Sequence, residues 1–354
     1  MKTSKLAAGA MALIVPATVC LTGCSFGVFN MMNYRYDNAD KYEAGNREID
    51  DKITRINLDY ASGNVTVKGT NADSVSVKER VNKDIDEDHQ VHTWVDGNTL
   101  YIRYCVSKDM ITFSGIEKSL EVTIPEAQNL NDFVINVSSG DILLDNFTTD
   151  SLNSHASSGN TRIDCSARVI EHKSSSGNVE LAQKGNADSV KVKLSSGNLV
   201  LDQEGDLDSL DIESSSGKIE VHQKGTVNKA RIHSSSGGAK AYMGTVNELT
   251  IEVSSGPIVL SADEVKTLNT KASSGHSDIK LDKAPATSRI ECSSGGIDVS
   301  IPEDSDITVH VKISSGEFDY ELPFVKDGKD YINGNGTNDM EIHCSSGNVG
   351  FHKI

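Results

Sequence analysis

The sequence predicts an all-β protein: a single-stranded parallel β-helix, or β-solenoid, with about 20 residues in each coil. A serine-glycine motif recurs twelve times, and most successive copies lie 18 to 21 residues apart. Between the copies, apolar and polar residues alternate with the period of two that is typical of strands. The last eleven copies share the core Ser-Ser-Gly, and their glycines are Gly140, Gly159, Gly177, Gly197, Gly217, Gly237, Gly256, Gly275, Gly295, Gly316 and Gly347. An earlier relative of the motif ends at Gly63.

The apolar residues keep fixed places around each glycine. They favour the seventh, fifth and third positions before it, as Val190, Val192 and Leu194 do before Gly197. We therefore expect one buried face in nearly every coil. Coils stacked about 4.8 Å apart in parallel register would satisfy one another's backbone groups and build a rod on the order of 50 Å long. A right-handed path is expected from the general preference of parallel connections.

The Ser-Ser-Gly motif is expected at the turn between two strands. Glycine permits a left-handed backbone there without a steric penalty. Strand parity predicts that the serine just before each glycine points inward, where its hydroxyl could bond to corner backbone groups. A catalytic serine would be a single residue activated by a base, so a motif repeated a dozen times indicates a structural turn.

The amino terminus predicts a lipoprotein signal peptide over residues 1–23. A basic head, Met1 to Lys5, precedes an apolar segment that is too short to span a bilayer. The tetrapeptide that ends at Cys24 resembles the bacterial lipobox, which implies cleavage before Cys24 and a lipid on its sulfur. Two or more acyl chains would anchor the protein stably to the extracellular face of the cytoplasmic membrane.

Three further regions follow the signal peptide. Residues 24–47 are expected to form a tether, and residues 48–130 irregular β rungs with long loops, with a separate small β domain as the alternative. Residues 131–354 are expected to form the regular solenoid, with an inserted loop between Gly316 and Gly347. The chain stops at Ile354, within the final rung and without an evident cap. An uncapped coil could recruit a partner strand.

The net charge of −17 restricts the partners. Loss of the signal peptide removes Lys2 and Lys5 and no acidic residue, so the mature chain is more negative still. This charge argues against nucleic acid and leaves cationic peptides, neutral glycans and proteins as possible ligands.

The cysteines indicate no disulfide framework. Cys292 and Cys344 share one inward position, and the rung of Ile313 is expected between them, which would place them beyond disulfide reach. We interpret both as small buried hydrophobes. A bridge between Cys105 and Cys165 is left open.

The best candidate site is a column of carboxylates. Asp278, Asp298 and Asp319 each stand third after a glycine, on rungs expected to be consecutive. Such a column is either tolerated in water or binds Ca²⁺ or a basic ligand. No other cofactor is expected. The segment from Asp84 to His89 imitates the start of a calcium loop but lacks the glycine and glutamate that such a loop needs, so we expect an exposed acidic loop.

The Ser-Ser-Gly rungs, the lead-in from Tyr34 to Gly45 and the first turn from Asp59 to Val65 resemble the bacterial putative-adhesin family of β-strand-repeat proteins, a domain of unknown function. The resemblance implies a surface-exposed β-solenoid, common in Gram-positive bacteria. Some relatives are tied to cell-envelope stress and antimicrobial-peptide responses. The family supplies no catalytic residues that transfer to this sequence.

Three functions compete at this point. The first is a non-enzymatic surface lipoprotein for adhesion or envelope sensing. The second is a carbohydrate-active enzyme that pairs Asp298 with Asp278 or Asp319, since retaining hydrolysis needs carboxyl groups about 5 to 5.5 Å apart. The third is a structural spacer rod. The first is favoured because no arginine lies in the column and no cleft is evident.

Overall fold

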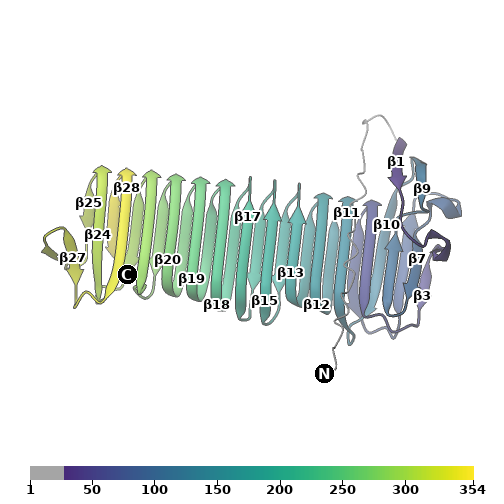
Figure 1. Ribbon diagram of the computed structural model, residues 1–354, viewed down its shortest axis with the longest axis horizontal. Coiled ribbons are helices and arrows are strands. Elements are labelled where there is room, and N and C mark those ends of the chain that lie inside the picture. The colour runs from purple at the N-terminus through teal and green to yellow at the C-terminus, as the bar shows by residue number, and fades with distance from the viewer. Residues whose placement is uncertain (1–27) are drawn as a thin grey trace, which may run out of the picture.

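The computed structural model describes residues 28–354 and shows a long rod of stacked β coils, with an irregular β cap at one end and a small hairpin at the other (Figure 1). The predicted signal peptide and Cys24 lie outside the described residues. Two short 3-10 helices, η1 (Ala39–Lys41) and η2 (Glu87–His89), interrupt the strands. Neither has the length or apolar composition to span a membrane, and residues 28–354 contain no other helix. The predicted all-β class is confirmed.

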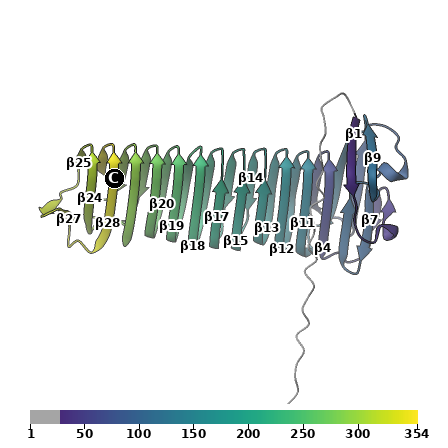
Figure 2. The ribbon, with the colours of Figure 1, turned by 45° about the horizontal axis from the view of Figure 1, so that its top comes forward.

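Each regular coil consists of two strands that face each other across a narrow interior, and Figure 2 shows the coils side by side. Strand β15 (Ala187–Leu194) runs up to a Ser-Ser-Gly turn, and β16 (Leu199–Gln203) leaves it. The next coil stacks in parallel: Val192 pairs with Ile212, and Leu201 with Val221. The predicted parallel stacking is therefore present, while the hand of the coil stays a prediction.

Each coil has a second corner, opposite the Ser-Ser-Gly turn. In several coils the chain bends at this corner without a break in the strand, so that two short strands merge into one long strand. The strands of the regular part are β11 (Asn129–Ser139), β12 (Ile142–Ser158), β13 (Thr161–Ser174), β14 (Val179–Gln183), β17 (Leu207–Ser214), β18 (Ile219–Ser236), β19 (Ala239–Ser255), β20 (Ile258–Ser274), β21 (Ser277–Leu281), β22 (Thr287–Ser294) and β23 (Ile297–Ile301).

The interior is one continuous apolar core that extends from the cap to the last coil. The residues predicted to point inward do so, and Val190, Val192 and Leu194 are all buried. Burial of each such side chain is worth about 1.5–3 kcal/mol, and stacking extends that gain from coil to coil. No coil could enclose these side chains alone, so each coil depends on its neighbours.

Residues 28–47 form part of the cap, so the prediction of a tether over residues 24–47 is wrong for this stretch. Strand β1 (Val28–Tyr34) pairs antiparallel with β9 (Lys108–Ser114), and Met31 and Tyr34 are buried against the cap. Tyr36 and Tyr42 extend an aromatic cluster to Trp94. Burial of these rings and of Met31 explains why the segment folds back onto the protein.

The other strands of the cap are β2 (Glu43–Ala44), β3 (Arg47–Ile49), β4 (Arg55–Ser62), β5 (Val65–Thr70), β6 (Val75–Val81), β7 (His92–Asp96), β8 (Thr99–Arg103) and β10 (Lys118–Pro125). The coil made of β4 and β5 comes first in the sequence but not first in the rod. β8 and β10 pair in parallel with its outer side, while β11 and β12 pair with its inner side. The region therefore extends the rod and shares its core.

The order of coils is also changed at the far end. The last strands are β24 (Ile307–Ser315), β25 (Phe318–Tyr320), β26 (Val325–Asp327), β27 (Asp330–Asn333), β28 (Asn338–Ser346) and β29 (Val349–Lys353). β28 pairs with β22 on one side and β24 on the other, and β29 lies between β23 and β25. The last coil in sequence is thus inserted before the coil of Gly316, which corrects the predicted order.

The inserted loop after Gly316 makes this arrangement possible. It folds into the β26–β27 hairpin, and β27 pairs antiparallel with the outer edge of β24 (Figure 1). After the hairpin, the chain returns to the side of β24 that faces the rest of the rod, where β28 lies between β24 and β22. The expectation of an uncapped final rung is therefore wrong, because this hairpin covers part of the end.

Candidate functional surfaces

The Ser-Ser-Gly turns line up along one edge of the rod. From the turn of Gly177 onward, both serines before each glycine are exposed, as Ser175 and Ser176 are. The predicted inward serine is therefore wrong, because strand alternation ends at the turn. Only an additional serine before the motif points inward, and Ser174 Oγ donates a hydrogen bond to the Ser176 carbonyl at 3.2 Å.

The turn glycines stack on one another, as the sequence predicts for a structural turn. Gly197 has a φ of 109°, and a Cβ atom there would lie 1.9 Å from the carbonyl oxygen of Gly177. The glycine contacts also follow the changed order of coils. A Cβ on Gly347 would meet the backbone of Gly295, and a Cβ on Gly316 would meet the backbone of Gly347, so the turn of Gly347 lies between the other two. Glycine is needed for its backbone angle and for the closeness of the neighbouring turn.

An asparagine ladder beside the glycines was missed by the sequence reasoning. The Asn178 backbone N–H donates to Asn160 Oδ1 at 3.0 Å, and the Asn198 N–H donates to Asn178 Oδ1 at 3.1 Å. The Lys218 N–H continues the series by donating to Asn198 Oδ1 at 2.9 Å. The signal was present as asparagine after several of the motifs. These side chains satisfy turn N–H groups that the strand ladder leaves over.

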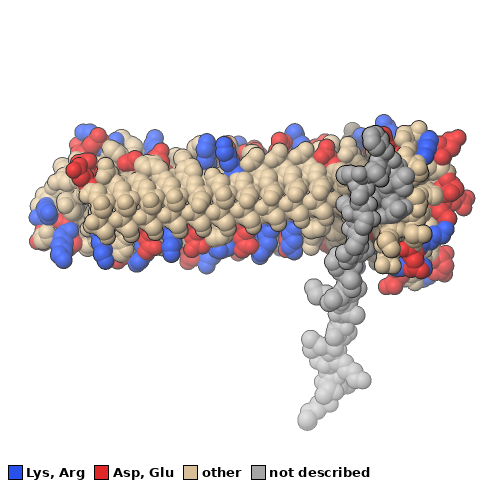
Figure 3. Space-filling model, turned by 90° about the horizontal axis from the view of Figure 1, so that it is seen from above, with Lys and Arg blue, Asp and Glu red and all other residues tan. Residues whose placement is uncertain are grey.

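We call the exposed serines and glycines of these turns the serine ridge. Figure 3 shows it as a continuous uncharged band along the rod, with charged side chains on both sides. Serine hydroxyls both donate and accept hydrogen bonds. In a chain with a net charge of −17, this band is a long polar surface without charged side chains.

The charged side chains beside the ridge pair from coil to coil. Lys193 Nζ lies 2.7 Å from Glu213 Oε2, and Lys271 Nζ lies 4.0 Å from Glu291 Oε2. Lys312 does not follow Glu291, because the coil of His343 comes between them. Exposed pairs of this kind are worth about 0–1 kcal/mol each, so they help to set register more than stability.

The predicted column of Asp278, Asp298 and Asp319 is broken. Asp278 pairs with Asp298, but Gly350 of the inserted coil lies between Asp298 and Asp319. The prediction failed because it assumed that the coils follow the order of the sequence. The three carboxylates therefore do not form a continuous site.

Two histidines surround the central carboxylate instead. His276 Nε2 lies 2.8 Å from Asp298 Oδ2, and His352 Nε2 lies 3.4 Å from Asp298 Oδ1. A Cβ on Gly350 would lie 2.4 Å from Asp298 Oδ1, so the absence of a side chain there gives the carboxylate room. Within residues 28–354, no three His, Cys, Asp or Glu side chains have an arrangement that would hold a metal ion.

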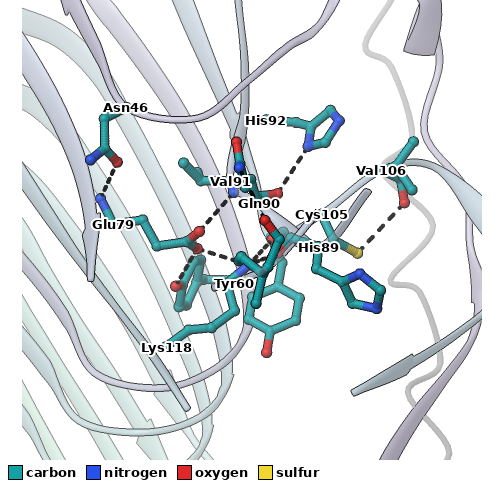
Figure 4. A network of polar contacts seen from close by, with 12 residues as sticks. Asn46, Tyr60, Glu79, His89, Gln90, Val91, His92, Cys105, Val106 and Lys118 are labelled. Atoms are coloured by element: carbon teal, nitrogen blue, oxygen red, sulfur yellow. Dashed lines mark hydrogen bonds and ion pairs between the residues drawn. The ribbon is translucent and has the colours of Figure 1, made fainter. Parts of the chain in front are cut away.

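The most enclosed charges lie in the cap (Figure 4). Lys118 Nζ is 2.8 Å from Glu79 Oε1, and the two side chains are 0% and 4% exposed. Glu79 also accepts hydrogen bonds from the Tyr60 hydroxyl and the Val91 N–H, both at 2.9 Å. Burial lowers the pKa of Lys118, and the carboxylate of Glu79 opposes that shift.

Lys118 also donates to the carbonyl oxygens of His89, at 2.5 Å, and Tyr104, at 2.6 Å. Partners within the protein thus surround the ammonium group, and the network joins cap strands rather than facing a ligand. No local pattern indicates this pair, because Glu79 and Lys118 lie far apart in the least periodic region of the sequence.

The acidic segment from Asp84 to His89 uses its carboxylates locally. Asp86 Oδ1 caps η2 by accepting the His89 N–H at 3.2 Å, and Asp88 forms an ion pair with Lys108. These contacts agree with the interpretation of the segment as an acidic surface loop.

The family model described as Toastrack DUF4097 matches residues 53–244 and 183–351. Together the two matches span nearly all of the described rod. The chain therefore belongs to this family of β-repeat proteins of unknown function. No curated protein matches it.

Solved structures give further similarities at low identity. A putative cell adhesion protein from Clostridium sporogenes is 9% identical, with a TM-score of 0.20, over 89% of this chain and 100% of that chain. A putative adhesin from Parabacteroides merdae is 12% identical, with a TM-score of 0.30, over 89% and 96%. A putative adhesin from Bacteroides fragilis is 13% identical, with a TM-score of 0.23, over 86% and 95%.

Proposed function

We propose that this protein is a non-enzymatic lipoprotein of the cell surface that presents its β-solenoid for adhesion, with the serine ridge as the contact surface. The observation that carries the proposal is the uncharged ridge, which runs along the rod between two charged borders (Figure 3). Its length and repetition suit an extended ligand better than a small molecule.

The chemistry of the ridge favours a neutral glycan. Paired hydroxyls recur at each coil, about 4.8 Å apart, and can exchange hydrogen bonds with sugar hydroxyls. A single exposed contact of this kind is weak, but a rigid row of them engages a polymer with high effective concentration. Anionic polymers would meet the negative net charge of the chain, which disfavours them.

Lipidation at Cys24 would place the rod outside the cytoplasmic membrane, in keeping with a Gram-positive surface protein. β1 begins at Val28, four residues after Cys24. Since an extended residue spans at most about 3.6 Å, the cap would lie within roughly 15 Å of the anchor. The far end of the rod would then be free to project outward.

The enzyme alternative keeps only one of its two carboxylate pairs, Asp278 with Asp298. Asp319 is separated from Asp298 by Gly350, and the remaining neighbours, Asp278 and Asp298, lie on an open strand face. The cap and the β26–β27 hairpin, which could wall a cleft, lie at opposite ends of the rod (Figure 1). A glycosidase needs its carboxylates flanking an enclosed sugar.

Binding to immobilised neutral polysaccharides tests the proposed ligand. The triple variant Ser196→Asp, Ser216→Asp and Ser255→Asp puts three charges on the ridge and should reduce binding at least tenfold. The control Val200→Asp, Thr250→Asp and Asn269→Asp adds the same charge on the strand faces and should leave binding unchanged. Equal binding by both variants would rule out the ridge as the contact surface.

Metabolic labelling with a fatty acid tests the anchor. The full chain should incorporate label and be digested by protease added to intact cells. Cys24→Ala should incorporate none. Label retained in Cys24→Ala, or protection of the rod from external protease, would contradict the proposed location.

A further inference from the structure

The inserted coil brings together two cysteines that are far apart in the sequence. Cys292 on β22 pairs directly with Cys344 on β28 in the parallel register. The prediction that a rung separates them is wrong, because the Ile313 coil lies on the far side of Cys344. Each residue is 2% exposed, and both are free thiols in the structure.

Their spacing suits a covalent bond. Directly paired residues on neighbouring strands lie about 4.8 Å apart, within the range of about 4.4–6.8 Å between Cα atoms over which disulfides form. Cys344 Sγ lies between two turns, 3.5 Å from the Gly295 carbonyl oxygen of the Cys292 coil and 3.4 Å from the Gly347 carbonyl oxygen of its own coil. Cys292 Sγ lies 3.4 Å from the Gly275 carbonyl oxygen, on the other side, and must rotate about χ1 to meet it.

We propose that Cys292 and Cys344 form a disulfide that locks the inserted last coil in place. The proposal rests on the extracytoplasmic location proposed above, where such bonds persist. The oxidant is an external disulfide, RSSR. One cysteine thiolate attacks it and expels RS⁻, and the second cysteine then attacks the mixed disulfide and expels another RS⁻. Two cysteine thiols are oxidised, and one RSSR is reduced to two RSH.

The bond would form as the last coil docks. Burial raises the pKa of both thiols, and Cys344 adds to the shift at Cys292, so little reactive thiolate exists in the folded rod. The bond would close a loop that contains β23, β24, β25 and the hairpin. The inserted coil could then no longer slip out from between its neighbours.

The bond should also be easier to reduce than most structural disulfides. Disulfides prefer Cβ atoms about 3.5–4.5 Å apart, slightly less than the spacing of two coils. Closing the bond therefore draws the coils together at some strain, and strained disulfides have higher reduction potentials.

The other two described cysteines serve as internal controls. Cys105 Sγ lies 4.0 Å from Met31 Sδ, and Cys165 pairs with Gln183 on the neighbouring strand. Neither has a cysteine as its partner in the ladder, so both should stay thiols under the same conditions.

The experiment refolds the full chain with oxidised glutathione, alkylates the free thiols without reduction, and maps tryptic peptides by mass spectrometry. We expect peptide 290–312 joined to peptide 330–353, two hydrogens lighter than their sum, and separated by dithiothreitol. Cys105 and Cys165 should be alkylated. Alkylation of Cys292 and Cys344, together with Cys105 and Cys165, would overturn the proposal.

Thermal unfolding gives a second readout. The oxidised protein should melt about 5 °C or more above the reduced protein. Cys292→Ser and Cys344→Ser should lose this dependence on reductant, whereas Cys165→Ser should keep it. A melting temperature indifferent to reductant in the wild-type chain would count against the bond.

Thiols trapped by alkylation in intact cells separate the two proposals. The linked peptides from cells would support both the bond and the location. A bond that forms on refolding but is absent in cells would support the geometry and contradict the extracytoplasmic location.

Discussion

Each turn glycine is constrained twice, by its own backbone angle and by the glycine of the coil before it. Gly185, at the second corner, separates the two constraints. Its φ is 98°, similar to the 109° of Gly197, but a Cβ on Gly185 would meet nothing within 4 Å. Substitutions at Gly185 and Gly197 therefore separate two contributions to the free energy of unfolding: the strain of the left-handed backbone and the clash with the neighbouring turn.

Gly197→Ala should destabilise the protein by about 3 kcal/mol or more, because strain is added to a backbone clash. Gly185→Ala should cost only the strain, about 1–2 kcal/mol. Urea unfolding of both variants measures the difference. Equal losses would show that the stacked turns can move apart, and that closeness is not what requires glycine.

His172 is a buried polar residue whose ring nitrogens lack hydrogen-bond partners. It is 0% exposed, and it pairs with Ser154 and Val192 in the ladder. Burial, with a smaller effect of His155, lowers the pKa of His172 to about 3.

This shift predicts acid sensitivity. The unfolded chain protonates His172 near pH 6.5 and the folded chain near pH 3, so the unfolded state binds more protons between these values. Stability should therefore fall as pH drops below 6.5, by about 2 kcal/mol at pH 5 from this residue alone.

His172→Val should remove that part of the pH dependence and raise stability at pH 7 by about 1–3 kcal/mol, since an unsatisfied polar group leaves the core. His222→Asn, at an exposed histidine, is the control. Urea unfolding at pH 5 and pH 7 checks both expectations. An unchanged pH slope in His172→Val would mean that water or movement satisfies the imidazole.

The cap strands β6 and β10 are held by their antiparallel ladder and by the buried pair of Glu79 and Lys118. Breaking a buried pair leaves an uncompensated charge, so Lys118→Met should cost about 3–5 kcal/mol. The exposed pair of Lys78 and Glu48, 3.0 Å apart, is the matched control, and Lys78→Met should cost about 0–1 kcal/mol. Urea unfolding compares the two variants. A small loss in Lys118→Met would show that Glu79 takes up a proton when its partner is removed.

At the scale of the whole rod, neither the first nor the last coil in sequence lies at an end. β4 and β5 are covered by β8 and β10, and β28 and β29 are covered by β24 and β25. In a stacked repeat protein each interface adds stability, so terminal coils fray unless they are capped. The crossing connections protect the coils nearest to the chain ends.

The sequence predicted the strands and turns of the regular coils, but it did not predict the order of the coils where the repeat is interrupted. Alternation around Gly197 is a local property that sets strand, face and turn, so these could be derived. The places of Gly350 and Cys344 depend on which coils pair, and pairing between distant segments leaves no local pattern. The inserted loop signalled that the spacing changes, but not that the chain turns back inside. The carboxylate column failed for this reason, and the cysteine pair was missed for the same one.

Hydrogen exchange can test the changed order directly. β29 ends one residue before the carboxyl terminus, yet it has paired neighbours on both sides: the Val349 N–H donates to the Glu317 carbonyl, and the Ile354 N–H to the Ile301 carbonyl. Among the described strands, β25 pairs only with β29. Amides near the chain end should therefore exchange more slowly than those of β25.

We expect peptides covering residues 349–354 to exchange roughly tenfold more slowly than peptides covering residues 317–322, once corrected for intrinsic rates. The measurement belongs under reducing conditions, so that a bond between Cys292 and Cys344 cannot supply the protection. In a rod whose coils follow the sequence, the last residues would form the outer edge and exchange first. Faster exchange at residues 349–354 than at β25 would thus indicate that the coils follow the order of the sequence. In that order Cys292 and Cys344 would not be neighbours, and the proposed disulfide could not form.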